Sequence, residues 1–150
     1  MTSKKYEFVP GDEIVIEPGR TVKRIRAIVA IAAFSIAPGD LGGYIETEKS
    51  LDHCGNAWVY GNARVCGDAQ VSGARLIFMA SSVGSENGTL TAYTTKDGII
   101  EVTRGCFRGS IDEFLLASER KHDDATHLEY RLLIEVAHSR IARAIKDEQK

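Results

Sequence analysis

Histidines are the residues of this chain whose type and surroundings most readily suggest chemistry. The 150-residue chain has four, and His53 lies inside a repetitive stretch, "LDHCGNAWVYGNARVCGDAQVSG", where it could act as a general base. A second cluster is "HDDATH", in which His122 and His127 flank two aspartates. Their five-residue spacing does not bring two ligands to one face of a helix, so helix capping explains this cluster better than a metal does. We therefore predict no metal or other cofactor and keep His53 as a weak catalytic candidate.

Arginines gather in two short segments that are candidates for binding phosphate or protein groups. In "RTVKRIR", Arg24 and Arg26 lie on a presumed strand, where ion pairing with nearby acids is the alternative. The glycine-flanked "TRGCFRG" has two interpretations. Phe107 either fills a core position or forms, with two arginines, an exposed patch suited to protein or nucleotide recognition. The candidate binding and interface residues are Trp58, Tyr60, Arg24, Arg26, Arg104, Phe107 and Arg108.

The elements that would position these residues are organised around a repeat of six residues. Gly-Asn or Gly-Asp is followed by Ala-x-Val three times over residues 55–71, and a weaker form of the frame extends over 41–88. Since residues two apart in a strand share a face, Ala and Val should point inward, and Trp58 and Tyr60 outward. Gly with Asn or Asp tolerates the positive φ of a sharp corner, so each repeat predicts one short strand and one bend.

Such hexads favour a left-handed parallel β-helix, in which three hexads close one triangular coil. A helical interpretation fails because glycine would recur at every sixth position, and strands this short with one bend cannot fold back as hairpins. The expected coil places Ala63 over Ile45 and under Ser81. The outward Trp58 and Tyr60 would then need cover from the flanking segments or from a second protomer.

The segments on either side of the repeat are expected to cap its ends. Pro-Gly turns separate short β-branched runs before residue 40, and the apolar segment 28–36 should plug the first coil. Residues 96–98 indicate a hairpin, and Ser110 with Glu113 forms a helical capping box. A second helix with an amphipathic stripe should begin near Asp124 or Thr126.

These patterns together predict a mainly β fold with C-terminal α structure. Its centre is a short left-handed parallel β-helix over residues 41–88. The expected caps are N-terminal strands in 1–40, a β-hairpin in 89–109 and two helices in 110–150, all in one folded unit.

Composition and charge argue against several classes of protein. The net charge of −2 gives no general reason to expect nucleic-acid binding, and the most apolar stretch is too short and too internal to span a membrane. The N-terminal residues lack the apolar run of a signal peptide. Three cysteines without metal-like spacing favour free thiols, and Cys54 and Cys66 should lie at corners or face outward without forming a disulfide. A cytoplasmic protein is the expectation.

The repeat and its flanks resemble a family of hexapeptide-repeat proteins common in bacteriophages and prophages. "RIRA" at residues 24–27 and "GDLGGYIE" at 39–46 are similar to the leader of that family. "GCFRGSIDEF" at 105–114 is similar to its C-terminal section, and the resemblance covers most of residues 20–135. It implies a phage-encoded or prophage-encoded accessory protein in which the repeat is a platform, and it brings no reaction with it.

The leading hypothesis is accordingly a non-enzymatic binding protein, although an enzyme is not excluded. It would be a homo-dimer or homo-trimer that presents its surface to a host protein or complex, and it would inhibit a bacterial defence system such as CRISPR-Cas. An alternative is a hexapeptide-repeat acyltransferase that uses acyl-CoA, with His53 as base. A further alternative is a counter-defence protein that sequesters a nucleotide at a subunit interface through Arg24, Arg26, Arg104 or Arg108.

Overall fold

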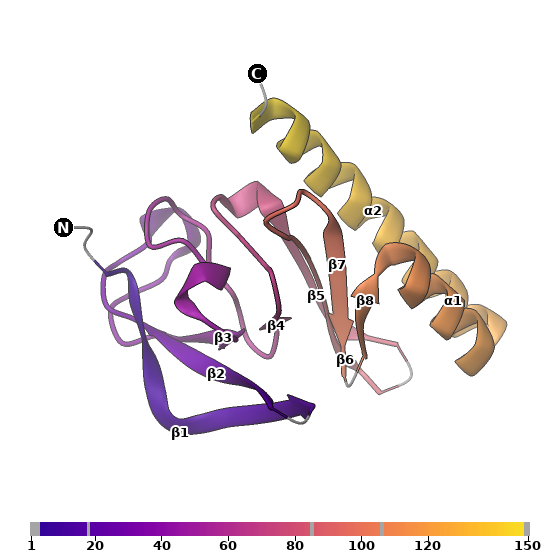
Figure 1. Ribbon diagram of the computed structural model, residues 1–150, viewed down its shortest axis with the longest axis horizontal. Helices are drawn as coiled ribbons and strands as arrows, with labels where there is room; N and C mark the ends of the chain where they lie inside the picture. Colours follow the sequence, from indigo (N-terminus) through magenta and orange to yellow (C-terminus); the bar gives the residue numbers. More distant parts are fainter. Residues whose placement is uncertain (1–3, 18, 85, 106, 149–150) are drawn as a thin grey trace.

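Three layers make up the molecule: two four-stranded sheets and a pair of helices (Figure 1). The computed structural model describes residues 4–17, 19–84, 86–105 and 107–148. The first sheet has the strand order β1-β2-β3-β4 and the second the order β5-β6-β7-β8. Helices α1 and α2 cover the face of the second sheet that is turned away from the first (Figure 1). The arrangement is a small, sandwich-like β structure with a helical outer layer.

The strands and helices follow the chain in a simple order. The first sheet consists of β1 Tyr6–Glu17, β2 Arg20–Ala27, β3 Leu41–Ile45 and β4 Arg64–Val65. The second consists of β5 Ile77–Val83, β6 Gly88–Thr94, β7 Ile100–Arg104 and β8 Phe107–Ser110. The helices are α1 Ile111–Lys121 and α2 Asp124–Glu148, and short 3₁₀ turns lie at Ala32–Phe34, Glu48–Ser50 and Ala74–Leu76.

The predicted left-handed β-helix, and with it the resemblance to the hexapeptide-repeat family, is wrong. Among the described residues, parallel pairing is confined to β3 with β4 and to one bridge between Leu51 and Val71. Ile45 lies opposite Val65, whereas the predicted coil placed it against Ala63. The other edge of β3 pairs antiparallel with β2, so a second coil cannot stack there.

The predicted coil also fails at its C-terminal end. After Val71 the chain passes through the turn Ala74–Leu76 and enters β5, which pairs antiparallel with β6. Ser81 therefore lies opposite Thr89 in the second sheet, and not beneath Ala63. The β-prone run "LIFMASSV" forms a hairpin with β6 here, because this pairing satisfies its backbone hydrogen bonds more completely than one further bend of the repeat would.

The repeat nevertheless supplies the first core as its period predicts. Its inward residues are all buried, namely Ala57, Val59, Ala63, Val65, Ala69 and Val71. They pack against Ile25 and Ile45 of the first sheet and against Tyr93 of the second. Each hexad therefore behaves as one small apolar unit, even though the units do not stack as a solenoid.

Trp58 departs from the expected parity, because it is buried with only 2% of its surface exposed. A Cβ at Gly42 would lie 2.8 Å from Trp58 Cζ2 and 2.7 Å from Ile25 Cγ1. The absence of a side chain at Gly42 thus leaves the space into which the indole packs. Cys66 is also buried rather than outward, whereas Cys54 is exposed, and both are free thiols.

A second core lies between the second sheet and the helices. Leu90 and Ala92 of β6 face α2 there, while the alternate residue Tyr93 faces the first core. The sheet is thereby covered on both faces, and β6 is buried along most of its length, including Thr91 and Thr94. The helical side of this core contains Phe114, Tyr130, Ile134, Ala137 and Ile141.

Several local predictions are confirmed. Strands β6 and β7 form a hairpin around residues 95–99, Ser110 and Glu113 form the capping box of α1, and α2 begins at Asp124. Of the apolar segment 28–36, Ile31 is buried but Phe34 remains 38% exposed, so this segment plugs the core only in part. Over the described residues, neither helix is long and apolar enough to cross a membrane.

Candidate functional site: a cationic and aromatic cavity

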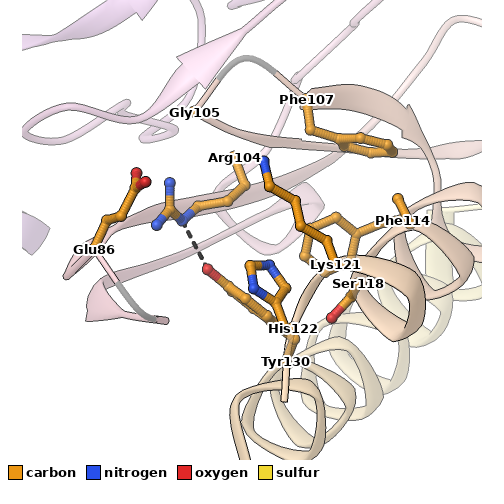
Figure 2. Close-up of a pocket in the computed structure, with 10 residues that line it drawn as sticks. Glu86, Arg104, Gly105, Phe107, Phe114, Ser118, Lys121, His122 and Tyr130 are labelled. Carbon is orange, nitrogen blue, oxygen red and sulfur yellow. Dashed lines mark hydrogen bonds between the residues drawn. The ribbon is translucent and has the colours of Figure 1, made fainter.

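A cavity of about 410 Å³ lies where the second sheet meets the corner between the two helices (Figure 2). One wall is the turn between β7 and β8, another is the loop between β5 and β6, and the third is the end of α1 with the start of α2. Its lining residues are Glu86, Arg104, Gly105, Phe107, Phe114, Ala117, Ser118, Lys121, His122 and Tyr130.

The sharp corner between α1 and α2 brings Lys121 and His122 to the cavity. Helix α1 ends at Lys121, and the His122 backbone N–H still donates to the carbonyl oxygen of Ser118 at 2.9 Å. Asp123 then opens α2 by accepting a hydrogen bond of 2.8 Å from the Thr126 backbone N–H. That bond lowers the pKa of the Asp123 carboxyl, as expected for an N-terminal capping carboxylate.

Arg104 and Tyr130 join the sheet to the helix at the back of the cavity (Figure 2). Arg104 Nε donates to the Tyr130 hydroxyl oxygen at 2.9 Å. Two glycines leave room for this pair: a Cβ at Gly88 would lie 2.6 Å from Arg104 Cζ, and one at Gly84 would overlap the Tyr130 hydroxyl. Gly84 also has a φ of +75°, which other residues rarely adopt.

The polar side of the cavity carries more positive than negative charge. Arg104 and Lys121 are cations, and Glu86 is the one acid among the described lining residues. Within the described part of the chain, Arg104 forms no ion pair, and its single side-chain hydrogen bond is the one to Tyr130. The two terminal nitrogens of its guanidinium are therefore left to bind an anion.

Aromatic rings form the opposite side of the cavity. Phe107 and Phe114 meet edge to face with ring centroids 5.3 Å apart, and Phe114 meets Tyr130 in the same way at 5.2 Å. The His122 ring lies 5.4 Å from that of Tyr130. Edge-to-face contacts of this kind fix the rings in place, so the apolar wall is preformed.

Ser118 and His127 are in hydrogen-bond contact at the edge of this site. Ser118 Oγ and His127 Nδ1 are 3.0 Å apart, and Ser118 lines the cavity. A nucleophile and base would also need a group that orients the imidazole, and no residue in the described ranges gives His127 Nε2 a partner. We interpret the contact as one that ties the end of α1 to the first turn of α2.

Of the predicted arginines, Arg104 alone lies at this cavity. Arg24 Nε pairs with Asp12 at 2.7 Å, and one terminal nitrogen donates to the Gly42 carbonyl. Arg26 pairs with Glu7 at 2.6 Å. Arg108 pairs with Glu101 at 3.2 Å and lies beside two neighbouring, separate pockets. These three arginines stabilise strand pairings, so their charge is already matched.

The contacts of the His53 side chain indicate a structural role. Its Nδ1 accepts a hydrogen bond of 3.0 Å from the Lys5 backbone N–H, and its Nε2 lies 3.1 Å from Glu48 Oε1. The imidazole also stacks on the Tyr6 ring with centroids 4.1 Å apart. Both ring nitrogens are thus engaged, and the residue fastens the start of β1 to the repeat. The described residues contain no group of three metal-ligating side chains.

The three predicted interface aromatics lie in different environments. Trp58 is buried, and its indole Nε1 has no hydrogen-bond partner among the described atoms. Tyr60 is 37% exposed and meets Phe34 edge to face at 6.1 Å. Phe107, by contrast, lies in the cavity wall with Arg104.

The cavity unites two motifs that the sequence offered as separate candidates. Arg104 and Phe107 come from "TRGCFRG", and His122 comes from "HDDATH". The other lining residues were not considered as site residues from the sequence, namely Glu86, Gly105, Phe114, Ala117, Ser118, Lys121 and Tyr130. Proximity of the two motifs to helix ends and turns was the available signal, but only the tertiary fold brings them together. Comparison with protein-family models, curated proteins and solved structures found no match to this chain.

Proposed function

We propose that this chain is a non-enzymatic binding protein whose cavity holds a small anionic ligand with a planar ring, such as a mononucleotide. The observation that carries this proposal is Arg104, a cation without an ion pair among the described residues, facing the same cavity as Phe107 and Phe114. The proposal follows the nucleotide-sequestering alternative, with the site at the helix corner and not at a subunit interface.

The two sides of the cavity suit the two parts of such a ligand. The Arg104 guanidinium and the Lys121 ammonium would hold the phosphate, because charge-assisted hydrogen bonds are stronger than neutral ones. The phenylalanine rings would contact the base, since aromatic side chains favour the π face of any base. A volume of about 410 Å³ lies within the range usual for small-molecule sites.

Calorimetric titration with nucleoside monophosphates tests this proposal directly. We expect binding of at least one monophosphate, with weaker binding of its nucleoside and of inorganic phosphate, because each of these lacks one half of the ligand. At a concentration of 100 times the dissociation constant, the ligand should stabilise the fold by about 2.7 kcal/mol, which thermal unfolding measures as a rise of several degrees.

Two arginine variants make the test specific. Arg104→Gln should weaken binding by roughly 10-fold to 100-fold, since it removes about 1.5–3 kcal/mol of charged hydrogen bonding. Arg26→Gln is the matched control, because this arginine is paired with Glu7 and lies in the other sheet. Equal loss in both variants, or no binding by the unmodified chain to any monophosphate, would contradict the proposal.

Two other hypotheses concern a bacterial defence system and an acyltransferase. Inhibition of a bacterial defence system remains a prediction, and the fold removes the resemblance on which it rested. We propose the cytoplasm as the place where the protein acts. The acyltransferase alternative loses its support, since both nitrogens of the His53 imidazole are engaged.

A further inference from the structure

Helix α2 has two apolar faces, and the second sheet covers only one of them. The covered face includes Tyr130, Ile134, Ala137 and Ile141, which pack into the second core. On the remaining surface, an apolar row of Leu128, Leu132 and Val136 is exposed by 43%, 52% and 48%. The three residues recur every four positions, so they form one ridge along the N-terminal half of the helix.

The charges beside this ridge are distributed unevenly along α2. In residues 124–135 the exposed acids are Asp124, Glu129 and Glu135, against the single base Arg131. In residues 138–147 the exposed bases are Arg140, Arg143 and Lys146, against the single acid Asp147. Asp147 is in turn neutralised by Arg75 at 2.8 Å. The exposed side of α2 is therefore acidic in its first half and basic in its second.

We propose that this ridge is a dimer interface at which α2 of a second copy of the chain packs antiparallel. A two-fold axis near the middle of α2 would place the acidic half of each helix against the basic half of the other. A parallel arrangement would place acid on acid and base on base, which is unfavourable. A two-fold interface brings the same surface of both copies together, so that surface must be complementary to itself. The charges along α2 meet this requirement when the two helices are antiparallel.

The apolar contacts agree with the same arrangement. With the axis between Leu132 and Val136, Leu132 of one copy lies beside Val136 of the partner copy. The ridge then continues onto Arg140 and Arg143, whose aliphatic stems can cover the partner's Leu128 while the guanidinium groups reach its acids. No residue of the ridge lines the cavity, so ligand binding and dimer formation can be tested separately.

Sedimentation equilibrium of the full chain over a range of concentrations tests the dimer. We expect a reversible monomer–dimer equilibrium, and Leu132→Gln should raise its dissociation constant at least tenfold. Leu116→Gln is the matched control, because Leu116 on α1 is similarly exposed, at 50%, but lies outside the ridge. Circular dichroism should show both variants folded, since both side chains are largely at the surface.

The orientation is tested by charge reversal and salt. Arg140→Glu should weaken an antiparallel dimer several-fold, because an acid would then face the acidic half of the partner, and added salt should weaken the dimer of the unmodified chain. Stronger association of Arg140→Glu would show a parallel arrangement and overturn the proposal. A chain that is monomeric at every concentration, a trimer, or equal effects of Leu132→Gln and Leu116→Gln would overturn it as well.

Discussion

The first sheet and the cavity beside the second sheet use arginine in opposite ways. In the first sheet, Arg24 and Arg26 are each held by a carboxylate from β1, so their charges stabilise the pairing of β1 with β2. In the second sheet, Arg104 has a tyrosine hydroxyl in place of an acid and faces a cavity. The sequence offered both groups as candidates. The charges of the first group are matched and structural, whereas Arg104, which has no ion pair among the described residues, is left to bind an anion.

Glycines show the same contrast between the two sheets. A Cβ at Gly43 of β3 would lie 2.7 Å from the carbonyl oxygen of Ala63 and 2.6 Å from Val59 Cγ1. The three atoms nearest to a Cβ at Gly88 of β6 all belong to the end of the Arg104 side chain. The first glycine therefore permits a close approach of two backbones, and the second makes room for a side chain of the candidate site.

The largest effect we expect is that of Gly43→Ala on folding. Because a backbone carbonyl in a packed core cannot move aside, the substitution should cost about 3 kcal/mol or more of the free energy of unfolding. The midpoint of urea unfolding, followed by circular dichroism, should fall by about 1 M or more. A fall no larger than that of Gly88→Ala would contradict the close approach of β3 to the repeat.

The repeat explains both what the sequence predicts and what it does not. A period of six correctly predicts that Ala57 and Val59 and their equivalents are buried, because side-chain alternation in a short strand is a local property. Whether successive units stack depends on which partner each strand edge finds. Here β2 takes one edge of β3, and β6 takes the chain after the repeat, so the solenoid does not form.

The candidate site was predictable only in part. The capping box at Ser110 and the start of α2 at Asp124 follow from short-range signals, and they define the helix corner. The position of Glu86 and Tyr130 beside Arg104 depends on contacts between segments distant in sequence. Trp58 was misplaced for a similar reason, because the space at Gly42 that receives it belongs to another strand.

A buried polar network joins the two sheets and gives a measurable pH dependence. The Tyr93 hydroxyl accepts a hydrogen bond of 3.2 Å from the Cys66 backbone N–H and donates one of 2.5 Å to Glu101. Burial is the main cause that raises the pKa of the Cys66 thiol from 9.0 to about 11, and burial also raises the pKa of Tyr93. The junction therefore favours the protonated forms of both groups.

The intermediate effect we expect is a loss of stability at alkaline pH. The folded state holds the Cys66 proton more tightly than the unfolded chain does, so stability is full below pH 9.0 and falls as the pH rises through about 11. The loss attributable to this thiol is up to about 2.7 kcal/mol. Urea unfolding at a series of pH values should show a shallower decline for Cys66→Ala than for the unmodified chain. Identical slopes would show that the thiol does not titrate differently on folding.

The smallest effect on stability, and the sharpest test of the comparison between the sheets, is that of Gly88→Ala. The new methyl group displaces only a flexible side chain end, so the free energy of unfolding should change by less than about 1 kcal/mol. The displaced guanidinium would lose its bond to Tyr130, and affinity for a mononucleotide should fall about tenfold. Calorimetric titration beside a urea series measures both quantities on one preparation. A variant that binds normally would place the ligand away from Arg104, whereas one that unfolds would show that β6 tolerates change no better than β3 does.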